Sequence, residues 1–141
     1  MILAAKEIQR QINAGNLVIR PYGEDCQQPA SYDLRAGEDI TLPVGACTLV
    51  HSLEWVELPA DIAGTLRCRS SFGRRGVLLG GGFVDPGFRG QLTLCLVNMG
   101  SEDVPLPRET RVVQLILHTV SGGGQMYDGR YQDSSGTVNA R

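Results

Sequence analysis

Short runs in which apolar and polar residues alternate recur along most of the chain, and Gly, Pro, Asn and Asp separate them. Alternation with a period of two is typical of strands that bury one face. We therefore expect strands at Leu17–Ile19, Ile40–Leu42, Cys47–Val50, Glu54–Leu58, Ile62–Cys68, Gly82–Val84, Gln91–Asn98, Val104–Leu106 and Arg111–Thr119. Many short strands with turn signals between them predict an all-β fold, a distorted jelly-roll-like β-barrel.

The first segment of the chain has a different period. Ile8 and Ile12 lie four positions apart with charged and amide side chains between them, which predicts a short amphipathic helix over Ala4–Ala14. Gly15 follows, and glycine commonly ends a helix. The expected fold class is thus all-β with a short N-terminal helix.

The last part of the chain differs in composition. Residues 1–120 carry the strand pattern without an internal repeat or linker, so we expect a single β domain there. Residues 121–141 are rich in Gly, Ser and polar residues, with Tyr127 and Tyr131 as the main anchors. Composition leaves two interpretations open: an ordinary frayed terminus, or a flexible segment that closes over a ligand.

Composition narrows the classes of function. The chain has 141 residues, a hydrophobic content of 42% and a formal net charge of −2. The charge argues against broad binding to nucleic acid or anionic membranes, although a local cationic pocket remains compatible with it. No apolar run approaches the roughly 20 residues that span a bilayer, and charges interrupt the N-terminus, which argues against a signal peptide. We therefore expect a cytoplasmic protein.

The cysteines do not form a recognisable metal motif. Cys26, Cys47, Cys68 and Cys95 show no CxxC spacing, and the chain has only two histidines. A structural zinc site is therefore not expected. We interpret the cysteines as reduced, mostly buried thiols.

The run Arg69–Gly76 gathers guanidinium groups, two serine hydroxyls and glycines within one turn. Arginine neutralises phosphate charge with forked donors, while serine hydroxyls and backbone N–H groups bind phosphate oxygens. The run indicates either a polyphosphate site or a solvated basic turn, and the residues alone leave both open.

A glycine-rich hairpin follows at Gly80–Gly90, with Asp85 as its one acidic side chain. Glycine allows a backbone to approach a ligand closely, and Phe88 is placed to stack on a sugar or base. The alternative for Asp85 is a turn-capping role, which is common for aspartate.

Taken in order, these segments resemble the dCTP deaminase branch of the dUTPase superfamily. The resemblance rests on the opening helix, Ile19–Tyr22, the first motif Gln28–Arg35, the RSSxxRxG-like run Arg69–Gly76, the hairpin Val84–Asn98, the strand Arg111–Leu115, and the closing residues Gly129–Gln132 with Gly136. It spans nearly the whole chain and keeps the order of the motifs. It implies a dUTPase-like fold, a homotrimer with sites between subunits, and a deoxynucleoside triphosphate as ligand.

The resemblance also implies roles for individual residues. It makes Asp85 the general base that activates water. It assigns substrate binding to Arg69, Ser70, Ser71, Gly73, Arg74, Phe88, Thr93, Cys95, Gln114, Tyr127, Arg130 and Tyr131. The base would meet the main chain around Thr93 to Cys95. Mg²⁺ would bridge substrate phosphates without direct protein ligands, and Asp33 would assist through water or serve a structural role in its strand.

One departure from the deaminases decides which member of the superfamily is expected. Their hairpin strand reads like TLEL, with a glutamate that shuttles protons, whereas this chain has Cys95 at that position. A thiol is a poor substitute because its pKa and reach differ. The chain is most similar to the short archaeal-type dUTPases, which implies hydrolysis of dUTP to dUMP and pyrophosphate. A second departure is Ser134, where deaminases often carry glutamine.

Two alternatives stay open. One is a dCTP deaminase, monofunctional or bifunctional, in which another acid replaces the glutamate; the nearest in sequence, Glu102 and Asp103, lie beyond Asn98 in an expected turn. The other is a non-catalytic deoxynucleotide-binding protein on the same fold, against which an intact Asp85 argues. Fold alone does not separate these functions.

Overall fold

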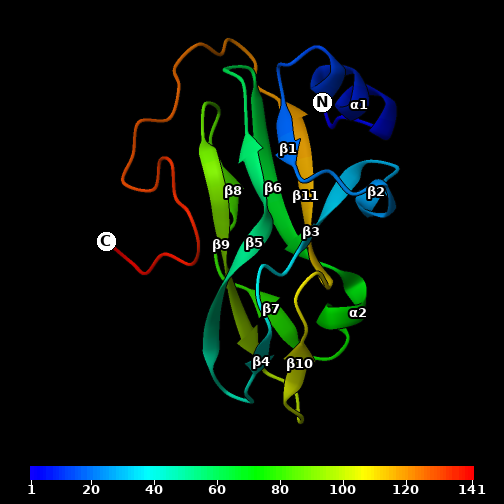
Figure 1. Ribbon diagram of the computed structural model, residues 1–141, viewed down its shortest axis with the longest axis vertical. Coiled ribbons are helices and arrows are strands. Elements are labelled where there is room, and N and C mark those ends of the chain that lie inside the picture. The colour runs from blue at the N-terminus through cyan, green and yellow to red at the C-terminus, as the bar shows by residue number, and fades with distance from the viewer.

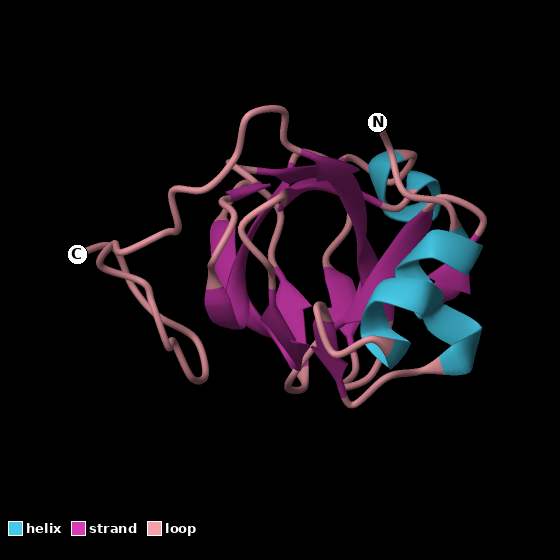
Figure 2. Ribbon diagram, turned by 90° about the horizontal axis from the view of Figure 1, so that it is seen from above, coloured by secondary structure: helices cyan, strands magenta, loops and turns pink.

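A computed structural model describes residues 1–141. Two larger sheets and one small sheet enclose the core, and the view from above shows the strands arranged as a distorted barrel (Figure 2). The first sheet has the order β1 (Val18–Arg20), β5 (Cys47–Glu57), β9 (Arg89–Asn98), β7 (Val77–Leu79). The second has the order β2 (Gln27–Gln28), β3 (Ser31–Arg35), β11 (Arg111–Thr119), β6 (Ile62–Cys68), β8 (Phe83–Val84). The small sheet pairs β10 (Val104–Leu106) with β4 (Ile40–Leu42). The expected all-β fold with a short N-terminal helix is confirmed.

Strands in which buried and more exposed side chains alternate form the core. In β9 the side chains of Leu92, Leu94 and Leu96 are buried, whereas those between them are partly exposed. β11 does the same with Leu115 and Leu117. These inward faces join one apolar cluster between the sheets, and its burial is the main stabilising contribution expected for a domain of this size.

The helices lie on one side of the barrel. Helix α1 (Ala5–Asn13) covers the core with Ile8, which is fully buried. It ends at Asn13, and Gly15 follows the C-cap Ala14 with a φ of 77°, which suits a residue without a Cβ. The Gly15 N–H bonds to the Ile12 carbonyl. The short helices η1 (Glu24–Cys26) and α2 (Ser70–Gly73) lie on the same side, opposite the C-terminal segment (Figures 1 and 2). No helix is long and apolar enough to cross a membrane.

The structure corrects several sequence-based expectations. Cys47–Val50 and Glu54–Leu58 belong to one strand, β5, with a register shift between His51 and Trp55 where it pairs with β9. Alternation did not reveal β7 or β3, because β7 is short and β3 is buried on both faces. Of the cysteines only Cys26 is fully buried and Cys47 is exposed, so the expectation of mostly buried thiols is wrong; all four are free thiols.

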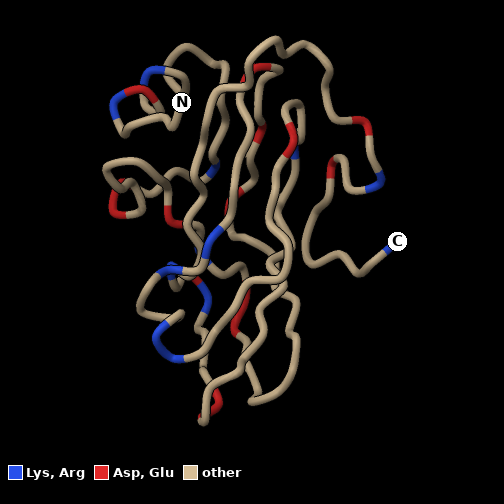
Figure 3. Tube along the Cα trace, turned by 180° about the vertical axis from the view of Figure 1, so that it is seen from behind, with Lys and Arg blue, Asp and Glu red and all other residues tan.

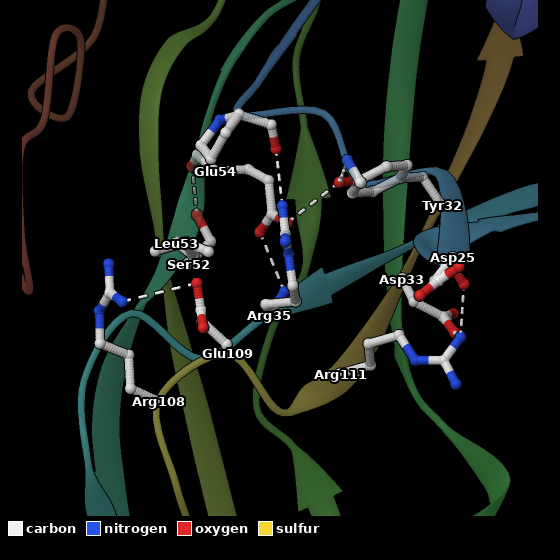
Figure 4. A network of polar contacts seen from close by, with 12 residues as sticks. Asp25, Tyr32, Asp33, Arg35, Ser52, Leu53, Glu54, Arg108, Glu109 and Arg111 are labelled. Atoms are coloured by element: carbon white, nitrogen blue, oxygen red, sulfur yellow. Dashed lines mark hydrogen bonds and ion pairs between the residues drawn. The ribbon is translucent and has the colours of Figure 1, made fainter.

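The inward face of β5 carries a carboxylate into the interior. Glu54 is fully buried, and it accepts hydrogen bonds from the Tyr32 hydroxyl at 3.1 Å, the Arg35 N–H at 2.9 Å and Arg35 Nε at 2.7 Å (Figure 4). Burial and the Glu54 charge raise the pKa of Tyr32 far above its ordinary value, so its hydroxyl remains a donor. The network ties β5 of the first sheet to β3 of the second.

Candidate functional site

A cavity of about 410 Å³ lies between the outer edge of β9, the glycine turn before β8 and the C-terminal segment. We call it the hairpin pocket. A volume of 300–1,000 Å³ with mostly apolar walls and a few polar groups is usual for small-ligand sites. Its walls are formed by Leu49, Leu66, Gly80, Gly82, Phe83, Val84, Asp85, Phe88, Gln91, Leu92, Thr93, Cys95, Tyr127, Tyr131, Ser134, Val138 and Ala140.

Strand β9 supplies the polar floor of the hairpin pocket. Because its leucines point into the core, Gln91, Thr93 and Cys95 point to the opposite face. Burial, together with the neighbouring Cys47, raises the pKa of the Cys95 thiol, so it stays protonated near neutral pH.

The main chain of β9 has an open stretch at this floor. Even-numbered residues turn their main-chain groups toward β5, as the bond from Asn98 N to the Ala46 carbonyl shows. Odd-numbered residues turn theirs to the other edge, where Gly80 N donates to the Cys95 carbonyl at 2.8 Å and Gln91 N donates to the Ser134 carbonyl at 2.8 Å. Between these two points the Gln91 C=O, the Thr93 N–H, the Thr93 C=O and the Cys95 N–H have no protein partner. Unpaired backbone groups inside a pocket are strong ligand-binding groups.

Asp85 lies at the end of β8 and supplies the only carboxylate in the lining of the hairpin pocket. It is exposed, and its side chain forms no hydrogen bond or ion pair. The turn that follows is fixed by Phe88, which is buried and packs edge-on against Tyr127 with ring centroids 5.7 Å apart. Asp85 also lines a second cavity, of about 530 Å³, beneath the glycine-rich segment 121–129. A rigid turn thus holds a free carboxylate at the junction of two cavities.

The C-terminal segment forms the outer wall of the hairpin pocket. It runs beside β9, and Asp133 N donates to the Arg89 carbonyl at 2.9 Å while its carboxylate pairs with the Arg89 guanidinium (Figure 1). Ser134 is buried against this edge. The segment is therefore docked on its own chain.

A third cavity, of about 430 Å³, lies on the outer face of the sheet that contains β3 and β11. We call it the arginine pocket. Its lining residues are Ile2, Gln28, Pro29, Ala30, Ser31, Asp33, Arg69, Ser70, Gln114 and Ile116. Basic residues gather around α2 beside it (Figure 3). Arg69 Nε lies 3.0 Å from Asp33 Oδ2, which orients the guanidinium at the pocket.

Asp33 is an unusual group in the arginine pocket. It is 1% exposed, and its Oδ1 has no hydrogen-bond partner although Oδ2 faces Arg69. Oδ2 also lies 3.7 Å from Arg111, which is beside Asp33 in Figure 4. Burial raises its pKa above the ordinary value, against the attraction of the two arginines. A buried carboxylate oxygen without a partner usually has a ligand, a water or an ion as its partner in function.

The comparisons with known proteins agree with this geometry. A family model described as dCTP deaminase-like matches residues 36–120. A protein named dCTP deaminase from Thermococcus sibiricus is 36% identical over 150 residues, which cover 95% of this chain and 93% of the relative. A protein named dCTP deaminase, dUMP-forming, from Methanopyrus kandleri is 33% identical over 174 residues, which cover 96% and 89%.

The chain belongs to the dCTP deaminase-like family.

Solved structures show the fold of this family. The 2′-deoxycytidine 5′-triphosphate deaminase from Agrobacterium tumefaciens matches with a TM-score of 0.72 at 21% identity, over 82% of this chain and 47% of that chain. The EIAV dUTPase matches with a TM-score of 0.65 at 22% identity, over 82% and 98%. The dCTP deaminase-like chain therefore shares its fold with a deaminase and with a dUTPase.

The site residues predicted from the sequence of this dCTP deaminase-like chain do not all lie in one cavity. The hairpin pocket brings together Asp85, Phe88, Thr93, Cys95, Tyr127 and Tyr131. The arginine pocket holds Arg69, Ser70 and Gln114, and the two cavities share no residue. Neither cavity is lined by Ser71, Gly73, Arg74 or Arg130. Within one chain the predicted phosphate-binding and base-binding groups do not meet.

Sequence reasoning missed several lining residues. Gln91 was detectable, because it shares the alternation of Thr93 and Cys95 in one strand. Leu49, Ser134 and Val138 were not, since only the pairing of β5 with β9 and the docking of the C-terminal segment bring them to the hairpin pocket.

Proposed function

We propose that this protein hydrolyses dUTP to dUMP and pyrophosphate. The observation that carries the proposal is the open main-chain stretch of β9, because three consecutive free groups in it, on Thr93 and Cys95, complement the edge of uracil. Asp85 supplies the reaction chemistry, and the lack of a second acid in the hairpin pocket argues against deamination.

The order of the free groups along the edge of β9 selects the base. The Thr93 N–H donates, the Thr93 C=O accepts and the Cys95 N–H donates. Uracil presents O2, N3–H and O4, which accept, donate and accept, so each group of the base meets its complement. Cytosine presents an acceptor at N3 and a donor at its 4-amino group, so two of its three groups would face like groups.

The acid–base groups of the hairpin pocket fit hydrolysis. Water attacks the α-phosphorus, Asp85 accepts its proton, and the bond from that phosphorus to the bridging oxygen breaks to release pyrophosphate. Deamination requires a further acid at the base to deliver protons to the ring and to the leaving amine. Cys95 occupies that position with a thiol of raised pKa. Glu102 and Asp103 do not line the pocket, and the Asp103 carboxylate accepts from Val44 N instead.

The triphosphate would be bound by the arginine pocket of a neighbouring copy. Arg69, Ser70 and Gln114 line that pocket. Ser71 and Gly73 lie in α2 and Arg74 follows it directly, and all three are exposed. Since these groups do not share a cavity with Asp85 in one chain, a complete site needs at least two copies. This supports a homotrimer with sites between subunits, in which Tyr127, Arg130 and Tyr131 of the C-terminal segment complete the pocket.

The residues of this chain are suited to Mg²⁺ that is already bound to the phosphates of the substrate. No cluster of three or more His, Cys, Asp and Glu side chains could hold a metal ion, but Asp33 offers one unpaired carboxylate oxygen at the arginine pocket. Mg²⁺ is usually held by one or two carboxylates together with substrate phosphates. When bound, it would neutralise charge on the phosphates, with Asp33 contacting its water shell.

The decisive experiment is to incubate the protein with dUTP and with dCTP separately and to identify the products. We expect dUMP and pyrophosphate from dUTP and no ammonia from dCTP. The names of the relatives favour a second candidate, dCTP deamination, which ammonia release from dCTP would establish. Binding of either nucleotide without turnover would identify a non-catalytic nucleotide-binding protein.

A further inference from the structure

Three consecutive residues of the C-terminal segment are held by three side chains and one main-chain N–H of the first sheet. Gly136 N donates to Gln91 Oε1 at 2.6 Å, and Val138 N donates to Thr93 Oγ1 at 3.0 Å. Between them, Thr137 Oγ1 lies 3.0 Å from both the main-chain N and the ring Nδ1 of His51. We call this set of contacts the tail clasp. Each hydrogen bond of the tail clasp involves a side-chain atom, and no strand ladder forms here.

The carboxamide of Gln91 has a fixed orientation in the tail clasp. Its Nε2 donates to the carbonyls of Ser52 and Leu53 at 3.2 and 3.3 Å, at the register shift of β5. Because the amide nitrogen must face these two acceptors, Oε1 must face the segment. The two carbonyls at the register shift of β5 therefore aim the Gln91 acceptor at Gly136.

The hydroxyl of Thr137 is used twice. It accepts from the main-chain N–H of His51, so its own proton is free to bond to Nδ1 of a neutral imidazole. The imidazole has little room to turn away, since a Cβ on Gly37 would lie 2.3 Å from its Nε2 and Cδ2 atoms. The imidazole is thus a rigid partner on the sheet for one hydroxyl on the segment.

The tail clasp lies next to the hairpin pocket. Val138 belongs to it and lines the pocket, and Ala140 follows. Upstream, Ser134 and Tyr131 line the same wall. We propose that His51 and Gln91 are positioning residues that hold the C-terminal segment over the hairpin pocket of its own chain before a nucleotide binds. The substrate in this proposal rests on the proposed function.

Loss of the tail clasp would affect binding more than turnover. A segment that is docked for a smaller fraction of the time lowers the population of the competent pocket, which raises the apparent dissociation constant. A saturating nucleotide restores the docked state, so kcat is unchanged while KM rises. A purely structural role of Thr137 would not separate the two constants in this way.

The test uses Thr137→Val, which keeps the branched shape and removes the hydroxyl. Thr137→Ser restores the hydroxyl, and Ser135→Ala is a matched control at an exposed residue without a side-chain hydrogen bond. We expect trypsin cleavage after the exposed Arg130, followed by intact mass in nucleotide-free protein, to be about 3- to 10-fold faster in Thr137→Val. The KM for dUTP should rise by a similar factor at unchanged kcat, and both controls should match wild type.

Several outcomes would overturn the proposal. Unchanged cleavage of Thr137→Val would show that the tail clasp does not hold the segment. Faster cleavage with an unchanged KM, or a lower kcat at an unchanged KM, would show that the segment does not position the substrate. If wild type forms no dUMP, the proposed function fails, and cleavage together with the dissociation constant of dUTP still decides the clasp. An unchanged dissociation constant in Thr137→Val would then overturn it.

Discussion

Replacing Asp85 by Asn separates catalysis from folding in this protein. The substitution keeps the size and shape of the side chain but removes the basic carboxylate. The Asp85 side chain is exposed and has no hydrogen bond or ion pair to lose. We therefore expect the free energy of unfolding to change by no more than about 0.5 kcal/mol, as for other surface substitutions.

The effect on turnover should be much larger. No other carboxylate lines the hairpin pocket, so nothing in it can take over proton transfer from Asp85. General bases typically contribute about 10²- to 10⁴-fold, and the lower figure corresponds to about 2.7 kcal/mol of transition-state stabilisation. We expect kcat for dUMP formation to fall at least ~100-fold in Asp85→Asn. Affinity for dUTP should persist, because the base and phosphates are bound by other groups.

The assay is pyrophosphate release at saturating dUTP, with urea unfolding and nucleotide binding measured on the same preparations. Asp128→Asn is the matched control, since Asp128 is exposed, unpaired and lines the adjoining cavity together with Asp85. It should turn over dUTP like wild type. Near wild-type turnover by Asp85→Asn would refute the assignment, and a large loss in Asp128→Asn instead would move the general base to that residue.

Four further predictions follow from the same geometry. Two mismatched groups at the open edge of β9 should each cost about 1–3 kcal/mol, so kcat/KM for dCTP should be at least ~30-fold below that for dUTP in a competition assay; equal values would contradict the proposed reading of the base. Cys95→Ala should leave pyrophosphate release largely intact, and abolished release would require a site built around the thiol. Arg74→Ala should weaken dUTP binding by about 1.5–3 kcal/mol in calorimetry, with Arg108→Ala as a control at an exposed arginine outside the run Arg69–Gly76; an unchanged dissociation constant would remove Arg74 from the site. Glu54→Gln removes the charge from a buried, hydrogen-bonded ion pair and should lower the free energy of unfolding by about 3–5 kcal/mol, whereas Glu109→Gln at an exposed carboxylate should change it by less than about 0.5 kcal/mol; similar values for both would show that the buried network does not stabilise the fold.

Local pattern was sufficient for much of the fold. The expected strands Ile62–Cys68 and Arg111–Thr119 coincide with β6 and β11, and Gly15 ends the first helix as its backbone freedom allows. Each of these features depends on neighbours within a few positions: a period of two for a half-buried strand, or a φ that favours glycine. The motif residues of the hairpin and the arginine-rich turn were likewise identifiable, because their chemistry is concentrated in short runs.

The sequence could not show which main-chain groups remain free. The main-chain groups at a strand edge are free or paired according to which segment lies beside them. At this edge of β9, Gly80 pairs with Cys95 at one end of the open stretch, and Ser134 pairs with Gln91 at the other end. The burial of Glu54 depends equally on the register between β5 and β9, since a shift of one residue would turn it outward. The sequence by itself thus determined most of the strands, the first helix and the residue types of the candidate site. The open main-chain edge of β9, the separation of the two pockets and the docking of the C-terminal segment were decided only by tertiary structure, because each depends on contacts between segments far apart in the chain.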